Sequence, residues 1–148
     1  MRIGVISDTH GLLRPEALAA LAGVEHILHA GDVGDIGILE ALREIAPVTA
    51  IRGNVDVSGA CAELPATEFV ELGGRGFYLV HSVHDLDLKP ESAGIDVVVS
   101  GHSHQPGIEM RGGVMYLNPG SVGPKRFRLP VSVAIVDGVA ARIVVLDR

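Results

Sequence analysis

The first half of the chain alternates short apolar runs with amphipathic segments, and this pattern predicts strands and helices in turn. Strands are expected at residues 2–7, 25–30 and 47–51, and helices at residues 15–22 and 35–45. The first helix has Pro15 in its first turn and Gly23 after its end, where these residue types commonly begin and end helices. In the second helix Ile38, Leu42 and Ile45 share one face. A β-α-β-α-β beginning of this kind implies a parallel sheet.

The second half contains strand candidates that follow one another with short glycine-containing turns. They lie at residues 67–72, 76–81, 95–100, 107–110, 113–117, 131–136 and 139–146. The pairs that flank Gly73-Gly74 and Asp137-Gly138 are typical of hairpins. Two mixed or packed sheets with helices outside them are therefore expected. Because no linker, low-complexity stretch or repeat is visible, residues 1–148 are predicted to form one domain.

Composition supports a sheet-rich interior. Of the 148 residues 47% are hydrophobic, but there are only two Tyr, three Phe and no Trp. Val, Ile, Leu and Ala must then fill the core, which favours buried sheet. The longest apolar stretches fall short of the roughly 18 residues that a membrane span needs, so no membrane span is expected.

Charge and cysteine content exclude some classes of function. The net charge of −6 argues against a surface that binds polymeric nucleic acid, because such surfaces are usually basic. The only basic cluster, at Lys125, Arg126 and Arg128, is interpreted as solvated surface. Cys61 stands alone and cannot form an intramolecular disulfide, so a reducing, cytoplasmic compartment is expected.

Polar side chains follow five of the predicted strands at the point where each strand ends. They are Asp8 and His10, Asp32, Asn54 and Asp56, His81, and His102 and His104. In open α/β sheets the ends of strands that run the same way line one crevice, where ligands bind. Parallel strands would therefore bring all of these groups to one place.

The donor atoms at these positions suit divalent metal ions. Imidazole nitrogens with carboxylate and amide oxygens, and no thiolate, favour Mn²⁺, Fe²⁺, Zn²⁺ or Ni²⁺. Seven ligands are too many for one tetrahedral ion. They suit two ions roughly 3.5 to 4 Å apart that share a carboxylate, an arrangement used in phosphoryl displacement.

Five motifs occur along the chain in the order Asp8-x-His10, Gly31-Asp32, Gly53-Asn54-x-Asp56, His81 and Gly101-His102-x-His104. This ordered set resembles the calcineurin-like metallophosphoesterase superfamily. The small size and the segment from Asn118 to Ser121 resemble its compact bacterial and archaeal phosphodiesterases, whose eukaryotic relative is the retromer scaffold subunit. The resemblance spans residues 3–121. It implies a four-layer α/β/β/α sandwich, in agreement with the strand and helix pattern.

The resemblance also implies a role for each residue. Asp8, His10 and His104 would hold the first ion, Asn54, His81 and His102 the second, and Asp32 would bridge both. Asp32, Asn54, His81 and His102 would take part in catalysis, with metal-activated water attacking phosphorus directly. Mn²⁺ is the expected ion, with Fe, Zn or Ni as alternatives, and a small phosphoester such as a nucleotide is the expected substrate.

Each of these residues has an ordinary structural interpretation when it is taken alone. Asp8 and Asp32 can cap helices, and a histidine at a strand end is more often hydrogen-bonded than a metal ligand. These interpretations fail together, because the residues also fall in the family's order. His26 and His29 match no motif and are predicted to pack or lie at the surface.

Three further features are predicted to surround the ions: a carboxylate, a set of glycines and a turn. Asp56 is expected to orient its neighbours by hydrogen bonding rather than to bind metal. Gly31, Gly53 and Gly101 are expected to let the backbone turn sharply beside the ions. The turn from Asn118 to Ser121 would close one wall of the site.

The chain departs from the family pattern at two positions beside the site. Many members have His where Val55 stands, and that His is thought to protonate the leaving group, which is typically worth 10²- to 10⁴-fold in rate. Catalysis would then be modest, depend on a good leaving group, or use another group such as His84. Ser82 stands after His81, where Gly is common in the family, and its side chain would narrow the approach to the second ion. The short segment from His81 to His102 leaves an open, shallow site.

Two other functions compete with the phosphoesterase. One is a protein-interaction scaffold that keeps the fold without the chemistry, but such a protein should have lost ligand residues, and all seven are present. The other is a nuclease of the same superfamily, which usually adds domains and basic surface that this chain lacks. A homo-oligomer is compatible with the strand-rich C-terminal half. The sequence identifies neither the physiological substrate nor the native metal.

Overall fold

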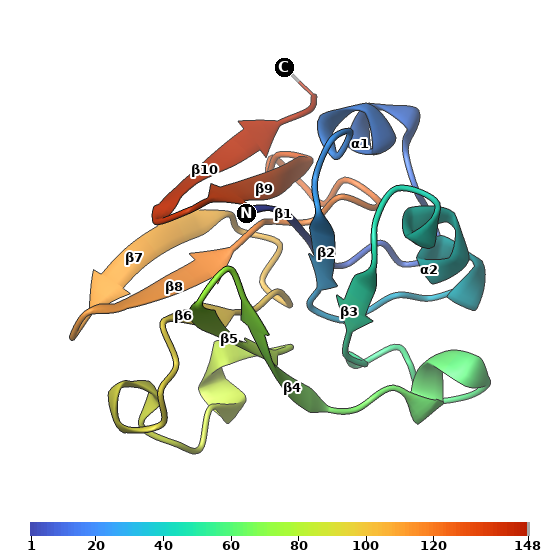
Figure 1. Cartoon of the computed structure of the whole chain (residues 1–148). Helices are drawn as coiled ribbons and strands as arrows, with labels where there is room; N and C mark the ends of the chain where they lie inside the picture. The colour runs from blue at the N-terminus through green and yellow to red at the C-terminus, as the bar shows by residue number, and fades with distance from the viewer. Residues whose placement is uncertain (148) are drawn as a thin grey trace.

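Two five-stranded mixed sheets make up most of the molecule, of which a computed structural model describes residues 1–147 (Figure 1). The first has the order β10-β9-β1-β2-β3, with bounds Arg2–Ile6 (β1), His26–His29 (β2), Val48–Ala50 (β3), Ser132–Asp137 (β9) and Ala140–Val145 (β10). The second has the order β4-β5-β6-β8-β7, with bounds Thr67–Leu72 (β4), Arg75–Val80 (β5), Val97–Val99 (β6), Gly107–Arg111 (β7) and Val114–Asn118 (β8). Strands β1, β2 and β3 are parallel, as are β5, β6 and β8.

The main core lies between the sheets. Ile3 and Val5 of β1 pack there with Phe77 and Leu79 of β5 in one buried cluster. Because side chains alternate along a strand, Val80 faces the opposite side of the second sheet and belongs to a separate cluster. The strands thus bury apolar side chains on both faces, which agrees with the aliphatic composition.

Helices cover the outer face of the first sheet. Helix α1 (Pro15–Ala20) begins at its proline as predicted, and α2 (Ile36–Arg43) begins after Asp35, whose carboxylate accepts a hydrogen bond from the Gly37 N–H at 2.9 Å. Leu39 and Leu42 of α2 are buried against this sheet. Both helices are shorter than the ranges 15–22 and 35–45 expected from the sequence.

The second sheet has a thinner cover on its outer face. Here Tyr78, Val98 and Leu88 form a small apolar cluster, and the neighbouring segments contain the 3-10 turns Val83–Asp85 (η2) and Pro90–Ser92 (η3). A third 3-10 turn, η1 (Ala60–Glu63), follows β3. The predicted class, an α/β sandwich of two mixed sheets with helices outside, is confirmed. In this chain short 3-10 turns stand where longer helices would make the fourth layer.

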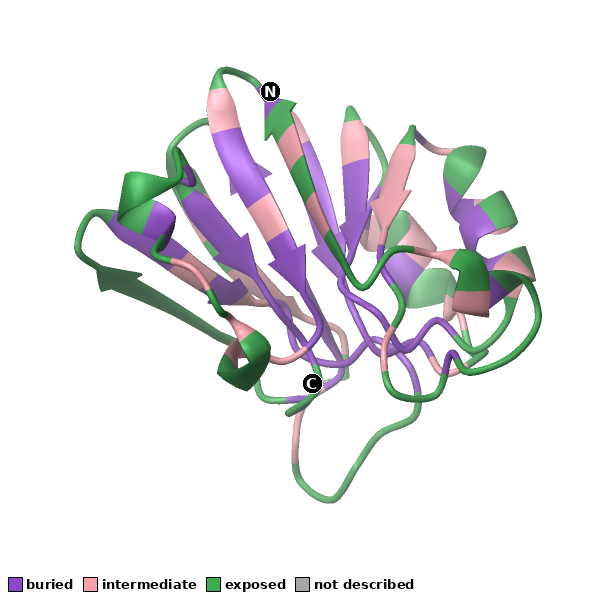
Figure 2. Ribbon diagram, turned by 90° about the horizontal axis from the view of Figure 1, so that it is seen from below, coloured by how far each residue is buried: buried purple, intermediate pink, exposed green. Residues whose placement is uncertain are grey.

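The strand predictions are also confirmed, with small differences at their ends. Strands β4 and β5 flank Gly73-Gly74, and β9 and β10 flank the Asp137-Gly138 turn, as antiparallel hairpins. Strand β2 ends at His29 rather than residue 30, because the chain there turns into a buried loop. Figure 2 shows that burial continues from several strands into the loops that follow them. Buried connections of this kind need internal hydrogen-bond partners.

Within residues 1–147 no helix is both long enough and apolar enough to cross a membrane. The single domain over residues 1–148, the cytoplasmic compartment and the homo-oligomer stay predictions, and Arg148 lies outside the described residues.

Candidate metal centre

The predicted ligands come from loops at the carboxyl ends of parallel strands in both sheets. Asp8 and His10 follow β1, Asp32 follows β2, and Asn54 follows β3 at a distance of four residues. His81 follows β5 directly, and the His102-x-His104 motif follows β6. Because the two sheets pack face to face, these ends meet at one edge of the sandwich.

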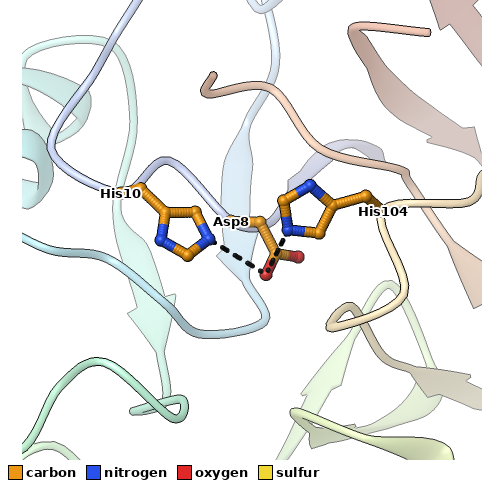
Figure 3. A group of neighbouring side chains, drawn as sticks. All are labelled: Asp8, His10 and His104. Atoms are coloured by element: carbon orange, nitrogen blue, oxygen red, sulfur yellow. Dashed lines mark ion pairs between the residues drawn. The ribbon is translucent and has the colours of Figure 1, made fainter. Parts of the chain in front are cut away.

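Five of the seven predicted ligands lie within a few ångströms of one another. Asp8 Oδ1 is 3.7 Å from His10 Nε2, 3.5 Å from His104 Nε2 and 3.9 Å from His81 Nε2. The approach of the two imidazoles of His10 and His104 to this oxygen is visible in Figure 3. Asp32 Oδ2 lies 3.5 Å from His10 Nε2 and 3.2 Å from His81 Nε2.

These atoms form two groups that can each hold a metal ion. One contains Asp8, His10 and His104, which is the set expected for the first ion, and the other contains Asp8, Asp32 and His81. Asp32 Oδ2 lies between one histidine of each expected shell, as a bridging carboxylate would. Asp8 belongs to both groups in the structure, although the resemblance assigns it to the first ion alone.

Asn54 and His102 lie at the exposed rim of the centre. The His102 ring is 5.2 Å from the His81 ring, measured between centroids, in an edge-to-face arrangement. Asn54 and His81 both line a cavity of about 360 Å³, together with Arg52, Thr67 and Asp85. Both rim residues therefore face solvent beside His81.

Several buried atoms of the centre have no hydrogen-bond partner. They are Asp8 Oδ1, His10 Nε2, His81 Nε2 and His104 Nδ1, and only Arg2 Nε joins them among residues 1–147. Leaving a buried polar atom unpaired costs about 1 to 3 kcal/mol. Divalent cations would satisfy these oxygen and imidazole nitrogen donors, so the residues present fit a metal centre.

Each carboxylate has one oxygen held by the protein and one directed at the centre. Asp8 Oδ2 accepts hydrogen bonds from Ser7 Oγ at 2.6 Å and from the His102 N–H at 3.1 Å. Asp32 Oδ1 accepts from the Val55 N–H at 2.9 Å. The other oxygens, Asp8 Oδ1 and Asp32 Oδ2, are the ones near the histidines. This division orients both carboxylates before any ion binds.

The His81 ring is oriented by the same principle. Its Nδ1 donates to the carbonyl oxygen of Ala30 at 2.7 Å, which directs Nε2 into the centre and leaves its lone pair for a metal. Burial alone would lower the pKa of His81, but the adjacent Asp32 carboxylate outweighs burial and raises it. Burial likewise opposes ionisation of Asp32, yet its contacts with His81 and the Val55 N–H lower its pKa.

Asp8 and His104 show the effect of burial more directly. Burial raises the pKa of Asp8 because the carboxylate is removed from water, although Ser7 and the neighbouring histidines oppose this shift. Burial lowers the pKa of His104, so its ring favours the neutral form that binds metal.

The backbone of the centre is in an uncommon conformation. Six residues other than glycine have positive φ angles within residues 1–147, and five are predicted ligands: Asp8 (58°), His10 (47°), Asp32 (57°), His102 (70°) and His104 (62°). Each such residue costs about 1 to 3 kcal/mol, and strain of this kind clusters at functional sites. Hydrogen bonds between loops, from Asp8 N to Gly31 O and from His10 N to Asp32 O, both at 2.9 Å, help to hold it.

The three glycines before the ligands serve two different purposes. Gly31 has φ of 102° and makes the sharp turn that was expected. Gly53 and Gly101 are outside the left-handed region, so the expected sharp turn is wrong for them; they permit close packing instead. A Cβ on Gly53 would lie 2.9 Å from Asp32 Cγ, and one on Gly101 would lie 2.6 Å from Asp8 Oδ2.

Gly101→Ala should therefore displace Asp8 from the centre. The added methyl group would collide with Asp8 Oδ2 and with Ser7 Oγ, and overpacking of this kind costs about 1 to 3 kcal/mol of unfolding free energy. We expect lower thermal stability and weaker Mn²⁺ binding, measured by calorimetry. Gly107→Ala is the control, because its Cβ would meet no atom within 4 Å. Equal behaviour of the two variants would contradict the expected role of Gly101.

The outcomes for the surrounding residues differ. Asp56 hydrogen-bonds its neighbours as predicted, accepting from the N–H groups of Val33, Gly34 and Gly53 at 2.9 to 3.0 Å. The Asn118–Ser121 turn lies beside the centre, since Asn118 Nδ2 donates to Gly101 O and Ser121 Oγ donates to Asp8 O, both at 3.1 Å, and its closing one wall stays a prediction. His84 is exposed in η2.

His29 is the residue whose role was missed. It is fully buried, as packing would require, but it also hydrogen-bonds Thr9 and Gly31 in the loops of the centre. His26, in contrast, is partly buried and bonds Thr49. One signal in the sequence was available: His29 lies three residues before Asp32 at the end of the same strand. Ser7 was missed in the same way, directly before Asp8.

Burial lowers the pKa of His29 to about 4, which predicts a pH-dependent stability. The unfolded chain takes up a proton near pH 6.5, but the folded chain does so only near pH 4, so the unfolding free energy falls as the pH drops across this window. The loss should be about 1 to 3 kcal/mol at pH 4. Denaturant unfolding with chelator present, at pH 7 and pH 4.5, measures it. His29→Phe should show a smaller difference, and an unchanged difference would contradict this assignment.

Comparison with known proteins identifies the family. The model of the calcineurin-like phosphoesterase superfamily domain matches residues 1–140. The chain belongs to this family. The family membership predicted from the sequence is thus confirmed. The chain is a metallophosphoesterase-family protein whose Asp and His side chains could bind divalent metal.

Relatives agree with this membership. A probable metallophosphoesterase of Methanothermobacter thermautotrophicus is 38% identical, over 93% of this chain and 87% of the relative. The solved structure of an archaeal phosphodiesterase has a TM-score of 0.84 and 26% identity, covering 99% of this chain and 100% of that one. Vacuolar protein sorting 29 from Cryptosporidium parvum has a TM-score of 0.76 at 18% identity, covering 97% of this chain and 95% of that one. This last likeness concerns the fold alone.

Proposed function

We propose that this chain is a binuclear metal-dependent phosphodiesterase that hydrolyses small phosphate esters by direct attack of water. The observation that carries the proposal is the convergence of five predicted ligands at one edge of the sandwich, four of which have buried atoms without a hydrogen-bond partner. The phosphodiesterase among the solved structures, similar over nearly the whole chain, supports the same reaction.

The proposed ligands would have different roles in the site. Two divalent ions, when bound, supply an activated water and neutralise charge on the phosphoryl group. Asp8, His10 and His104 would hold one ion, Asn54, His81 and His102 the other, and Asp32 would bridge them. Asn54 and His102 lie at the exposed rim and His81 is buried beside them, so a substrate phosphate would approach from this side. We take Mn²⁺ as the native ion, with Fe, Zn or Ni as alternatives.

The side chain at position 55 limits which esters can react. The backbone N–H of Val55 donates a hydrogen bond to Asp32, and its side chain is 47% exposed. Because this side chain is aliphatic, it has no proton to give to a leaving group. His84 is exposed in η2, whereas Asp85 lines the cavity beside Asn54 and His81. We therefore expect hydrolysis to depend on a good leaving group.

The cavity favours small substrates. Its volume of about 360 Å³ and its open rim suit a small phosphate ester such as a nucleotide rather than a polymer. The net charge of −6 again disfavours polymeric nucleic acid. A protein-interaction scaffold remains the alternative function, and the likeness to vacuolar protein sorting 29 is compatible with it at the level of fold. The complete set of seven ligands favours the enzyme.

Metal reconstitution tests the proposal. Protein stripped with a chelator and reloaded with Mn²⁺, Zn²⁺, Ni²⁺ or Fe²⁺ should hydrolyse bis(p-nitrophenyl) phosphate, and faster than p-nitrophenyl phosphate. His26→Gln is the matched control and should keep full activity, because His26 lies at the start of β2 and bonds Thr49 instead of a predicted ligand. Failure of every reloaded form to cleave either ester would refute the enzyme and favour the scaffold.

A further inference from the structure

A buried histidine links the two loops that carry three of the proposed ligands. His29 and Thr9 are both fully buried. The Gly31 N–H donates to His29 Nδ1 at 3.1 Å, and His29 Nε2 lies 3.0 Å from Thr9 Oγ1. Thr9 Oγ1 in turn donates to the carbonyl oxygen of Val33 at 2.7 Å.

These contacts determine where the protons lie. Because His29 Nδ1 accepts from a backbone N–H, the ring proton must be on Nε2, and Nε2 donates to the Thr9 hydroxyl. The hydroxyl then has its own proton free for Val33 O. Both ring nitrogens are occupied, so His29 is not itself a metal ligand.

The contacts join elements that must keep a fixed separation. Thr9 stands between Asp8 and His10 in the loop after β1, and Gly31 directly precedes Asp32 in the loop after β2. Asp8, His10 and Asp32 all have left-handed backbones, which the surrounding structure must stabilise. An apolar side chain in place of His29 would fill the space but leave the Gly31 N–H without this partner.

We propose that His29 is a positioning residue for the metal centre, which acts through Gly31 and Thr9 to hold Asp8, His10 and Asp32 at the separation that two ions require. The inference rests on one part of the proposed function, namely that this centre binds two metal ions; it does not depend on the hydrolysis of an ester. Loss of groups that orient metal ligands typically weakens metal binding about 10- to 100-fold. A similar loss is expected when either His29 or Thr9 can no longer make its hydrogen bonds.

Mn²⁺ binding to the whole chain, measured by titration calorimetry without substrate, tests the inference. His29→Phe and Thr9→Val should each weaken binding about 10- to 100-fold. The double variant should lose little more than the weaker-binding single variant, because both remove one chain of hydrogen bonds. Thr9→Ser keeps the hydroxyl and should retain the affinity of the natural chain. The electron paramagnetic resonance signal of coupled Mn²⁺ pairs should weaken in the first two variants and persist in Thr9→Ser.

Matched variants separate positioning from general damage. His26→Phe changes the other histidine of β2, which bonds Thr49 instead, and should bind Mn²⁺ normally. Thermal unfolding of each metal-free variant shows that it folds. If His29→Phe fails to fold, the Thr9→Val and Thr9→Ser pair decides alone. Natural Mn²⁺ affinity in a folded Thr9→Val overturns the inference. If the natural chain binds two ions and cleaves no ester, the proposed function fails and the inference stands.

Discussion

Asp32→Asn is expected to reduce hydrolysis of an aryl phosphodiester by about 10³-fold or more. Asp32 Oδ2 is the oxygen that lies between His10 Nε2 and His81 Nε2, at 3.5 and 3.2 Å. An amide has a similar shape but no negative charge with which to bridge two cations. Steady-state kinetics and the metal content per chain measure the effect, and the variant should hold fewer than two ions.

A substitution three residues away provides the control. Asp35 is exposed and caps α2, and asparagine caps helices equally well, so Asp35→Asn should keep both activity and metal content. Two ions and full turnover in Asp32→Asn would remove the proposed bridge, whatever the Asp35 variant does.

Removal of divalent metal should lower the melting temperature markedly. At a free metal concentration of about 1,000 times Kd, binding stabilises the folded state by about 4 kcal/mol, or roughly 8 to 16 °C for a chain of this size. The reason is local: Asp8 Oδ1 and three imidazole nitrogens are buried without partners, and the loops that carry them are strained. Bound cations would offset both the cost of the unpaired atoms and the cost of the strained loops.

Thermal unfolding in chelator and across a Mn²⁺ series measures this dependence. The melting temperature should rise with the logarithm of metal concentration above Kd. Asp32→Asn should show a weaker rise, which ties the effect to this centre. A melting temperature that is the same in chelator and in excess Mn²⁺ would contradict metal binding at these residues.

The sequence alone was sufficient to locate the candidate site. Apolar runs that end in Asp, Asn or His are local patterns, and parallel strands bring their carboxyl ends to one edge whatever the remaining topology. For this reason Asp8, Asp32 and His81 were placed together before their contacts were known. The start of a helix was also predicted from local sequence. Pro15 lies at the first position of α1, which the fixed φ of proline favours.

The tertiary structure alone decided how the site is built. Ser7 Oγ and the N–H of His102, a residue 94 positions away in the sequence, hold one oxygen of Asp8. The other oxygen therefore faces the histidines. Gly101 is needed because β6 ends against the loop after β1, not because of its own φ. Contacts of this range leave no trace in local periodicity.

His29 shows the same limit most directly. In the sequence it is one more histidine in an apolar strand, and only the pairing of β1 with β2 brings it beside Thr9 and Gly31. The local sequence pattern thus determined which residues form the candidate metal centre, because short runs of residues are enough to predict where a strand ends. Their orientation, protonation and support come from side chains that meet only when two sheets pack, and so the folded structure had to decide them.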